Sequence, residues 1–297
     1  MSPNSMRVLI TEKCNSKCRN CFNSVYREKK EIDITTYIKL CEYLSRNKIK
    51  RVKIMGGEPT VHSAFEHIIT ISQSYFESVV IFTNALNDRI MNVHPRRKDT
   101  IVYNFNFFSS RFNKEKFLLD RLGNRRLEVQ IGNRTNVEHV TNRLSLLKSI
   151  PNLKINLTLD CMENIFDDKI KLEQKFITIS DYIRNELKTD YLVDHKIPFC
   201  FWTKNTIVPD AMCLDNCVGL IDSSLRFRFC NQFEPSLCDL IDVDGEFVSF
   251  DKIMSILEMC YVSKIDSLKG ERCGDCNHFP HKCNGGCFAH KTIVKLS

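Results

Sequence analysis

The sequence lacks any apolar run of the roughly 18 to 20 residues that a membrane-spanning helix needs. Its amino-terminal residues also lack an apolar stretch followed by a small-residue cleavage site, the mark of a secretory signal. No internal repeat or low-complexity tract stands out. We therefore expect a cytoplasmic protein with no membrane partner. Apolar residues in general are not scarce, because 43% of the 297 residues are hydrophobic and 20 are Phe, enough to build a core.

Cysteine is abundant, with 15 residues. In a reducing cytosol this number favours metal ligands or reactive thiols over disulfides, and an odd number cannot pair completely. Three cysteines lie within residues 14–21 and nine within residues 213–287. The two groups predict two domains, a main domain over residues 1–204 and a smaller, loop-rich, cysteine-rich domain over residues 205–297.

Short β-rich runs alternate with helical runs over residues 6–187, a pattern typical of an α/β fold with a parallel sheet. Apolar residues at helical spacing predict helices after the candidate caps Thr35 and Thr36, after Asn136, and from Leu172 to Leu187. The second domain shows only short runs at 225–229 and 246–250. The six predicted strands are 6–11, 51–55, 78–84, 101–108, 126–132 and 153–160.

The last three predicted strands each alternate an apolar row with a polar one. If helices cover the apolar rows, the polar rows face the inside of a barrel or half-barrel, where a ligand can bind. The other interpretation is a solvent-facing sheet. The polar rows are Asn104 and Asn106; Glu128 and Gln130; and Asn156, Thr158 and Asp160.

A C-x3-C-x2-C motif, formed by Cys14, Cys18 and Cys21, follows the first predicted strand. Three thiolates on one loop can hold three irons of a cubane cluster and leave the fourth iron open to a ligand. Spacing alone also allows a zinc knuckle completed by a distant His or Cys.

The second predicted strand ends in the sequence Gly56-Gly57-Glu58-Pro59. Two glycines let the backbone approach a ligand closely, and the carboxylate and carbonyls can receive an ammonium group. The cysteine motif after strand one and GGEP after strand two together resemble the radical S-adenosylmethionine (SAM) enzymes. This resemblance implies a partial (β/α)6 barrel over residues 6 to about 187. It also implies a 4Fe-4S cluster on Cys14, Cys18 and Cys21, with Gly56, Gly57, Glu58 and Pro59 lining SAM.

The third predicted strand ends in Thr83-Asn84, which resembles the T-N-G of this family, although Ala85 stands where glycine is usual. The resemblance implies that Thr83 and Asn84 also line SAM. Asn104, Asn106 and Asn156 lie on strands that in the family supply polar contacts to SAM, and they could equally face substrate. Asn20 departs from a position that is usually aromatic, and Phe22 could cover the cluster instead.

A second cysteine motif, C-x2-C-x6-C-x3-C, lies near the carboxyl end, and Cys213, Cys217 and Cys230 form a C-x3-C-x12-C motif upstream of it. Alone it could be a zinc ribbon. Beside a radical SAM core it resembles the SPASM domain or its smaller relative, the twitch domain, which implies one or two auxiliary 4Fe-4S clusters. One would use Cys213, Cys217, Cys230 and Cys287. The other would use Cys273, Cys276 and Cys283, with His290, Cys238, Cys260 or an open position as the fourth ligand.

The resemblance implies reductive cleavage of SAM to a 5'-deoxyadenosyl radical that abstracts hydrogen from a substrate. We expect a peptide or protein side chain to be modified or crosslinked; the alternative is a dehydrogenase or tailoring enzyme acting on a small molecule such as a sugar or cyclitol. No amino-terminal leader-binding domain is expected, so a peptide substrate would need a separate leader-peptide-binding protein or direct docking. An electron donor such as flavodoxin or ferredoxin is implied as a partner.

No catalytic acid or base is selected, because the inward candidates Glu128, Asp160 and Cys161 each have a structural interpretation. A third hypothesis is a non-catalytic metal-binding module that binds nucleic acid through basic runs at 96–98 and 125–126. These runs are typical of solvated loops. The formal charge of +7 would also be partly offset by the clusters, so a nucleic-acid partner is not expected.

Overall fold

The computed structural model describes residues 4–18, 21, 30–104, 125–150, 153–159, 168–193, 219–229 and 236–268, without the side chains of 125 and 261–268. The chain divides into two compact units, each of which is described separately. The predicted domain boundary after residue 204 lies outside the described residues and stays a prediction. Unit 1 comprises Met1–Asn104, Asn113–Arg125 and Cys217–Cys260, and unit 2 comprises Phe105–Phe112, Arg126–Asn216 and Tyr261–Ser297.

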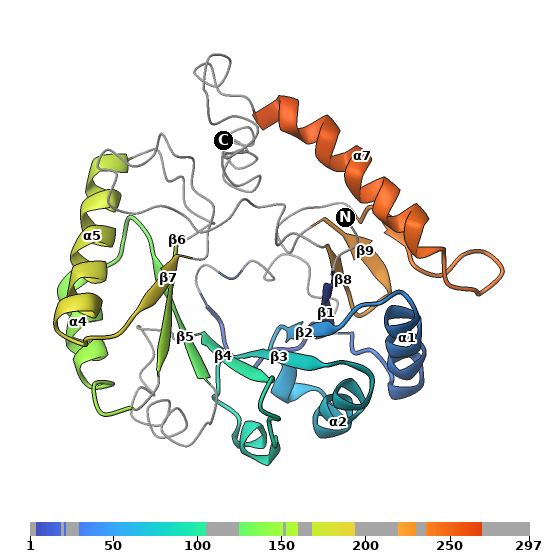
Figure 1. The fold of residues 1–297 in the computed structure, drawn as a ribbon, viewed down its shortest axis with the longest axis horizontal. Helices are drawn as coiled ribbons and strands as arrows, with labels where there is room; N and C mark the ends of the chain where they lie inside the picture. Colours follow the sequence, from blue (N-terminus) through green and yellow to red (C-terminus); the bar gives the residue numbers. More distant parts are fainter. Residues whose placement is uncertain are drawn as a thin grey trace. The chain divides into compact units, whose positions relative to one another are not determined.

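A parallel sheet forms the centre of unit 1 (Figure 1). Its strands β1 (Ser5–Thr11), β2 (Arg51–Gly56), β3 (Ser78–Thr83) and β4 (Thr100–Asn104) pair in chain order. On the other side of β1 lies β8 (Leu220–Ile221), also parallel to it, followed by the antiparallel strands β9 (Arg226–Arg228) and β10 (Cys238–Asp239). Because parallel strands end at one edge, the residues after β1, β2, β3 and β8 are brought together there.

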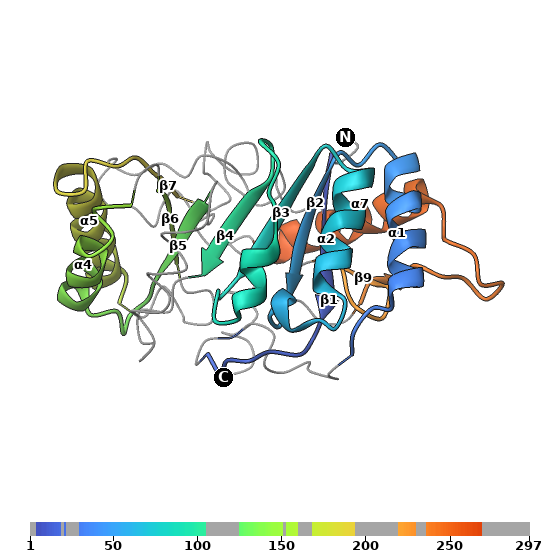
Figure 2. The same ribbon diagram turned by 90° about the horizontal axis from the view of Figure 1, so that it is seen from below.

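Helices α1 (Ile34–Arg46) and α2 (Phe65–Tyr75) pack side by side on unit 1 (Figures 1 and 2). The apolar residues at helical spacing that predicted α1 are buried, namely Tyr37, Leu40, Cys41 and Leu44. The Tyr37 hydroxyl lies 2.7 Å from Ser72 Oγ on α2. The predicted caps were wrong: Asp33 caps the helix by accepting from Thr36 N at 2.9 Å, because its carboxylate lies at the true N-cap position. Short 3-10 helices η1 (Pro59–Val61) and η2 (Asp88–Asn92) follow β2 and β3.

Unit 2 contains the parallel strands β5 (Arg125–Ile131), β6 (Lys154–Leu159) and β7 (Tyr191–Val193). Helices α4 (Val137–Ser145) and α5 (Lys169–Asn185) cover one face of these strands (Figure 1). Asn136 caps α4, as predicted, by accepting from His139 N at 3.0 Å. The predicted α/β class with a parallel sheet is confirmed, and all six predicted strands are present, although residues 105–108 of the fourth lie outside the described residues.

The segment after residue 218 contains the same tight turn twice, a repeat that the pattern of residue types did not reveal. Asp222 Oδ1 accepts from the N–H groups of Ser224 and Arg226 at 2.9 and 3.0 Å. Asp242 Oδ1 accepts from the N–H groups two and four residues later, both at 3.0 Å. The third residue after each Asp has a positive φ, +57° at Leu225 and +83° at Gly245. The two hairpins are therefore copies of one backbone design, 20 residues apart.

Within the carboxyl-terminal part of the chain, residues 250–268 form the 19-residue helix α7 (Phe250–Leu268), which was not predicted. The second hairpin, which precedes α7, packs against α1. Tyr43 stacks on Phe247 with ring centroids 4.6 Å apart, and its hydroxyl donates to Val248 O at 2.9 Å. In the part of the chain that the structure describes, no helix is long and apolar enough to cross a membrane.

Candidate functional site

The segment that follows the cysteine loop pairs with the segment that precedes it, and these two segments form the base of the loop. Ile32 N donates to Ile10 O at 3.0 Å, Glu12 N donates to Lys30 O at 2.9 Å, and Lys13 Nζ lies 2.7 Å from the Glu31 carboxylate. The loop that carries the three cysteines therefore begins and ends at a fixed place beside the end of β1.

The GGEP turn packs directly on this base. Gly57 N donates to Thr11 O at 2.7 Å, and Glu58 N donates to Lys13 O at 2.8 Å. A Cβ atom on Gly57 would lie 2.3 Å from Lys13 O and 2.6 Å from Glu12 O, closer than any side chain can be placed. The second glycine is thus required for the backbone of β2 to meet the backbone that leads into Cys14.

The carboxylate of Glu58 lies in the interior of unit 1 and is 1% exposed. Oε1 accepts from Thr60 Oγ1 and Thr83 Oγ1, both at 2.7 Å, and from Thr60 N at 3.2 Å. Oε2 accepts from Asn84 N at 2.7 Å. Burial raises the pKa of Glu58, against the lowering effect of the hydrogen bonds from Asn84, Thr60 and Thr83. Its side chain therefore joins the end of β2 to the end of β3.

The end of β3 is shaped by the residues that were predicted from the T-N-G resemblance. Thr83 Oγ1 also accepts from Ala85 N at 2.9 Å. Asn84 Nδ2 donates to Asn15 Oδ1 at 2.8 Å, which joins this turn to the cysteine loop. Ala85 has φ +53°, so the position that is usually glycine does adopt the left-handed conformation that glycine favours.

The three thiols present suitable chemistry for an iron-sulfur cluster. Cys14 and Cys21 are half-buried and Cys18 is exposed. Ser16 N donates to Cys14 Sγ at 3.4 Å, and Ser16 Oγ lies 3.6 Å from Cys18 Sγ. Hydrogen bonds to cluster sulfurs are one means by which proteins set a cluster's potential. Among the residues that the structure describes, no three His, Cys, Asp or Glu side chains are grouped closely enough to hold a metal ion, so joint ligation by these cysteines stays a prediction.

Sequence reasoning missed a buried polar group on the β8 side of the cysteine loop. Glu12, two residues before Cys14, is 1% exposed and accepts from Ser223 Oγ at 3.4 Å. The adjacent Asp222 is equally buried and pairs with Arg228 at 2.8 Å and with Arg226 at 2.9 Å. The pairing of β8 with β1 creates this group, and only that long-range pairing could have revealed it.

Residues of the predicted polar rows pair between β5 and β6 in unit 2. Glu128 is opposite Asn156, and Gln130 is opposite Thr158. Asn156 is 2% exposed, and within the described ranges its Oδ1 has no hydrogen-bond partner. A buried acceptor without a partner is costly, which supports a ligand contact at this position. Asn104 is exposed at the end of β4, while Asn106, Asp160 and Cys161 lie outside the described residues.

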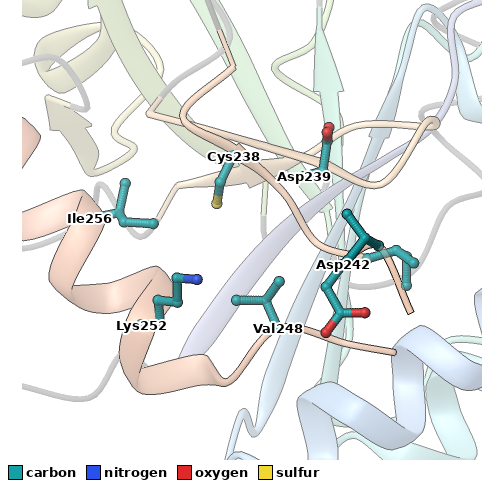
Figure 3. Close-up of a pocket in the computed structure, with 8 residues that line it drawn as sticks. Cys238, Asp239, Asp242, Val248, Lys252 and Ile256 are labelled. Atoms are coloured by element: carbon teal, nitrogen blue, oxygen red, sulfur yellow. The ribbon is translucent and has the colours of Figure 1, made fainter. Parts of the chain in front are cut away.

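Of the predicted auxiliary-cluster residues, only the optional ligands Cys238 and Cys260 are described. Cys238 lines a hollow of about 560 Å³ between the second hairpin and the start of α7, together with Asp239, Asp242 and Lys252 (Figure 3). Burial and the neighbouring Asp239 raise the pKa of Cys238. Outside the described residues lie Cys213, Cys217, Cys230, Cys273, Cys276, Cys283, Cys287 and His290.

Two other predictions concern residues with structural tasks. Cys41 is 1% exposed on α1, and burial raises its pKa to about 12, as expected for a core thiol. Arg96, from the basic run at 96–98, donates to the carbonyls of Gln73 and Phe76 at 2.5 and 2.9 Å and pairs with the buried Asp99. Its guanidinium is occupied within the protein.

Part of the chain is similar to a known protein family. Residues 8–126 match the Radical SAM superfamily. Among curated proteins, the GTP 3',8-cyclase of Chlorobaculum tepidum is 22% identical over 199 residues, which cover 65% of this chain and 55% of the cyclase. The chain thus spans about half the length of that relative. Residues 8–126 are therefore similar to a radical SAM domain, and the matched superfamily consists of enzymes that use SAM and a 4Fe-4S cluster.

Solved structures share the fold. SuiB of Streptococcus suis bound to SAM has a TM-score of 0.68 at 14% identity, covering 99% of this chain and 74% of SuiB. SuiB bound to its precursor peptide SuiA has a TM-score of 0.62 at 16% identity, covering 89% and 73%. Native anSMEcpe, with bound SAM and the Kp18Cys peptide, has a TM-score of 0.67 at 14% identity, covering 96% of this chain and 89% of anSMEcpe.

Proposed function

We propose that this protein is a cytoplasmic radical SAM enzyme of the SPASM type that abstracts hydrogen from a peptide or protein side chain, which it modifies or crosslinks. The observation that carries the proposal is the joining of three strand ends in unit 1. Backbone and side-chain hydrogen bonds hold the base of the cysteine loop, the GGEP turn and the Thr83-Asn84 turn together. Each of these segments carries residues of the radical SAM pattern.

Cys14, Cys18 and Cys21 would ligate the 4Fe-4S cluster and leave one iron for SAM. When bound, cluster and SAM supply an electron transfer that yields methionine and a 5'-deoxyadenosyl radical. Gly56, Gly57, Glu58, Pro59, Thr83 and Asn84 would line SAM at the ends of β2 and β3. The buried carboxylate of Glu58 is occupied by four protein donors, so we assign the methionine ammonium group to backbone carbonyls of the turn.

The polar rows would contribute the remaining contacts. Asn156 Oδ1, which has no partner among the described residues, would accept a donor from SAM or substrate, and Asn104 and Asn106 are further candidates. A buried amide without a protein partner is favourable only when a ligand or water satisfies it. Glu128, Asp160 and Cys161 remain the candidates for proton transfer to or from the substrate.

One or two auxiliary 4Fe-4S clusters would be held by the carboxyl-terminal cysteines. The first would use Cys213, Cys217, Cys230 and Cys287; the second would use Cys273, Cys276 and Cys283 with His290, Cys238, Cys260 or an open fourth position. Cys238 and Cys260 are both half-exposed, so either can be reached by a metal. Iron and zinc analysis after anaerobic reconstitution tests this assignment: eight or twelve irons per chain support it, and stoichiometric zinc contradicts it.

A peptide substrate is favoured by the fold, because SuiB and anSMEcpe, which share it, were both solved with peptides bound. A separate leader-peptide-binding protein would then be a partner, and flavodoxin or ferredoxin would supply the electron. The alternative is a small-molecule substrate such as a sugar or cyclitol, and the match to GTP 3',8-cyclase favours this class. Screening peptides encoded beside this protein, with SAM-derived 5'-deoxyadenosine as readout, separates the two classes.

The proposal as a whole is tested by anaerobic reconstitution followed by reduction with dithionite. We expect SAM to be cleaved to 5'-deoxyadenosine and methionine only when reductant is present. A protein that carries its full iron and sulfide complement yet leaves SAM intact, with and without candidate substrates, would contradict the proposal.

A further inference from the structure

We propose that Asn84 is a positioning residue for the cysteine loop, acting through Asn15. The inference rests on the proposed function, because it concerns the loop that would hold the cluster. Asn84 Nδ2 donates to Asn15 Oδ1 at 2.8 Å, across 69 positions of sequence. Asn15 directly follows Cys14, so this hydrogen bond joins the end of β3 to the loop beside its first thiol.

The orientation of the Asn84 amide is set by a second contact. Its Oδ1 accepts from Leu86 N at 3.0 Å, and because a backbone N–H can only donate, the amide oxygen must face Leu86. The amide nitrogen is consequently directed to Asn15. Both polar atoms of the side chain are used within the protein, which assigns the amide to the loop rather than to SAM.

Asn84 is in turn anchored to the interior. Its backbone N–H donates at 2.7 Å to Oε2 of Glu58, a carboxylate that is 1% exposed and also accepts from Thr83. A buried charged acceptor with several donors forms strong hydrogen bonds. The backbone of Asn84 is therefore fixed at the ends of β2 and β3, and its side-chain amide restrains the exposed residue Asn15.

The contact lies where it can affect the thiols. Asn15 is exposed, and the next residue, Ser16, donates its N–H to Cys14 Sγ and lies 3.6 Å from Cys18 Sγ through its hydroxyl. Fixing Asn15 restricts the backbone that sets both sulfur contacts. Residues that orient metal ligands commonly influence metal retention as strongly as some ligands do.

The test compares Asn84→Ala, Asn15→Ala and the double variant with Asn87→Ala in the full-length reconstituted protein. Asn87 is a matched control, because it also bridges two turns, accepting from Arg89 N at 3.1 Å and donating to Thr60 O at 3.1 Å, but both of these partners lie outside the cysteine loop. The readouts are the decay of the SAM-responsive EPR signal after addition of a chelator, the KM for SAM, and the Tm of the iron-free protein.

We expect Asn84→Ala and Asn15→Ala each to speed the decay of the EPR signal by about three- to tenfold, because each variant loses one hydrogen bond. The double variant should be no faster than the faster single variant, because both remove the same bridge. Asn87→Ala should lower Tm without changing the decay. If Asn84→Ala does not fold, Asn15→Ala decides alone, since Asn15 is exposed.

An Asn84→Ala variant that raises the KM for SAM, while Asn15→Ala decays like wild type, would overturn the inference and make the side-chain amide of Asn84 a direct SAM contact. Wild-type decay in both variants, in a protein that loads and cleaves SAM, would overturn the inference alone. A wild-type protein that takes up no cluster would overturn the proposed function as well.

Discussion

Oγ1 of Thr83 donates to Oε1 of Glu58 at 2.7 Å, so a residue that ends β3 satisfies a carboxylate that follows β2. Both side chains are 1% exposed. This relationship places two of the predicted SAM-lining residues inside the protein as partners of one another. The site is therefore built on a buried polar network that joins neighbouring strand ends.

Glu58→Gln tests this network, because the amide keeps the shape but offers only one acceptor oxygen to the four donors. We expect a loss of about 1–3 kcal/mol in the free energy of unfolding, measured by urea denaturation of the iron-free protein. Thr83→Val should cost a similar amount, and the double variant should cost less than both losses added together. Strict additivity would mean that the two side chains do not act as a pair.

The left-handed backbone at Ala85 predicts an unusual order of substitutions. Its side chain is 0% exposed and its φ is +53°, so Ala85→Val adds both strain and volume and should cost about 2 kcal/mol or more. Ala85→Gly removes the strain and should be close to neutral. Ala64→Val, at φ −108°, is the control and should have little effect on thermal unfolding. Equal losses at positions 85 and 64 would argue against the backbone conformation described.

Glu66 and Arg89 predict a specific acid dependence of stability. The Arg89 guanidinium lowers the pKa of Glu66 from 4.5 to about 2 and also donates to the carbonyls of Thr60, His62 and Ser63, beside the GGEP turn. Because the folded pKa lies below the unfolded one, the contribution of Glu66 is complete above pH 4.5 and is lost as the pH falls from 4.5 to 2.

In Glu66→Gln the free energy of unfolding should accordingly fall less steeply over pH 4.5 to 2 than it does in wild type. Glu138→Gln, at an exposed position of α4, should keep the wild-type slope. The comparison requires chemical denaturation at several pH values. Identical slopes for Glu66→Gln and wild type would show that the ion pair does not form.

Glycine has different importance in the two hairpins after residue 218. Gly245 has φ +83°, and a Cβ added there would have no neighbouring atom within 4 Å, so Gly245→Ala should cost only the backbone strain of about 1–2 kcal/mol. Gly219 has φ +77°, and a Cβ there would lie 2.2 Å from the ring of the buried Phe227. Gly219→Ala should therefore lower Tm more than Gly245→Ala, and the opposite order would contradict the placement of β8 and β9.

Hydrophobic periodicity was sufficient to predict the strands β1 to β6 and the helices α1, α4 and α5, because each buries one continuous row. The short strands β7, β8 and β10 were not predicted. The cap of α1 was misassigned because Thr35 and Thr36 are as suitable chemically as Asp33, and only the helix start distinguishes them. The duplicated turn was missed because its two copies share few residue types besides the leading Ile-Asp and a Phe.

The motif residues could be located from the sequence, but their contacts could not. Three contacts depend on which strands are neighbours in the sheet. They are Glu58 with Thr83 and Asn84, Asn84 with Asn15, and Glu12 with Ser223. Parallel pairing brings together residues 25 to 211 positions apart. Spacing along the chain carries no signal for such contacts.

The central claim is that Cys14, Cys18 and Cys21 hold a cluster with an iron open to SAM. The most direct measurement is the EPR spectrum of the reduced, reconstituted protein with and without SAM, for wild type, Cys18→Ala and Cys41→Ala. We predict that SAM changes the spectrum of wild type and of Cys41→Ala, whose buried thiol lies on α1, but not that of Cys18→Ala. A SAM-dependent change that persists in Cys18→Ala, or that is absent from fully loaded wild type, would contradict the claim.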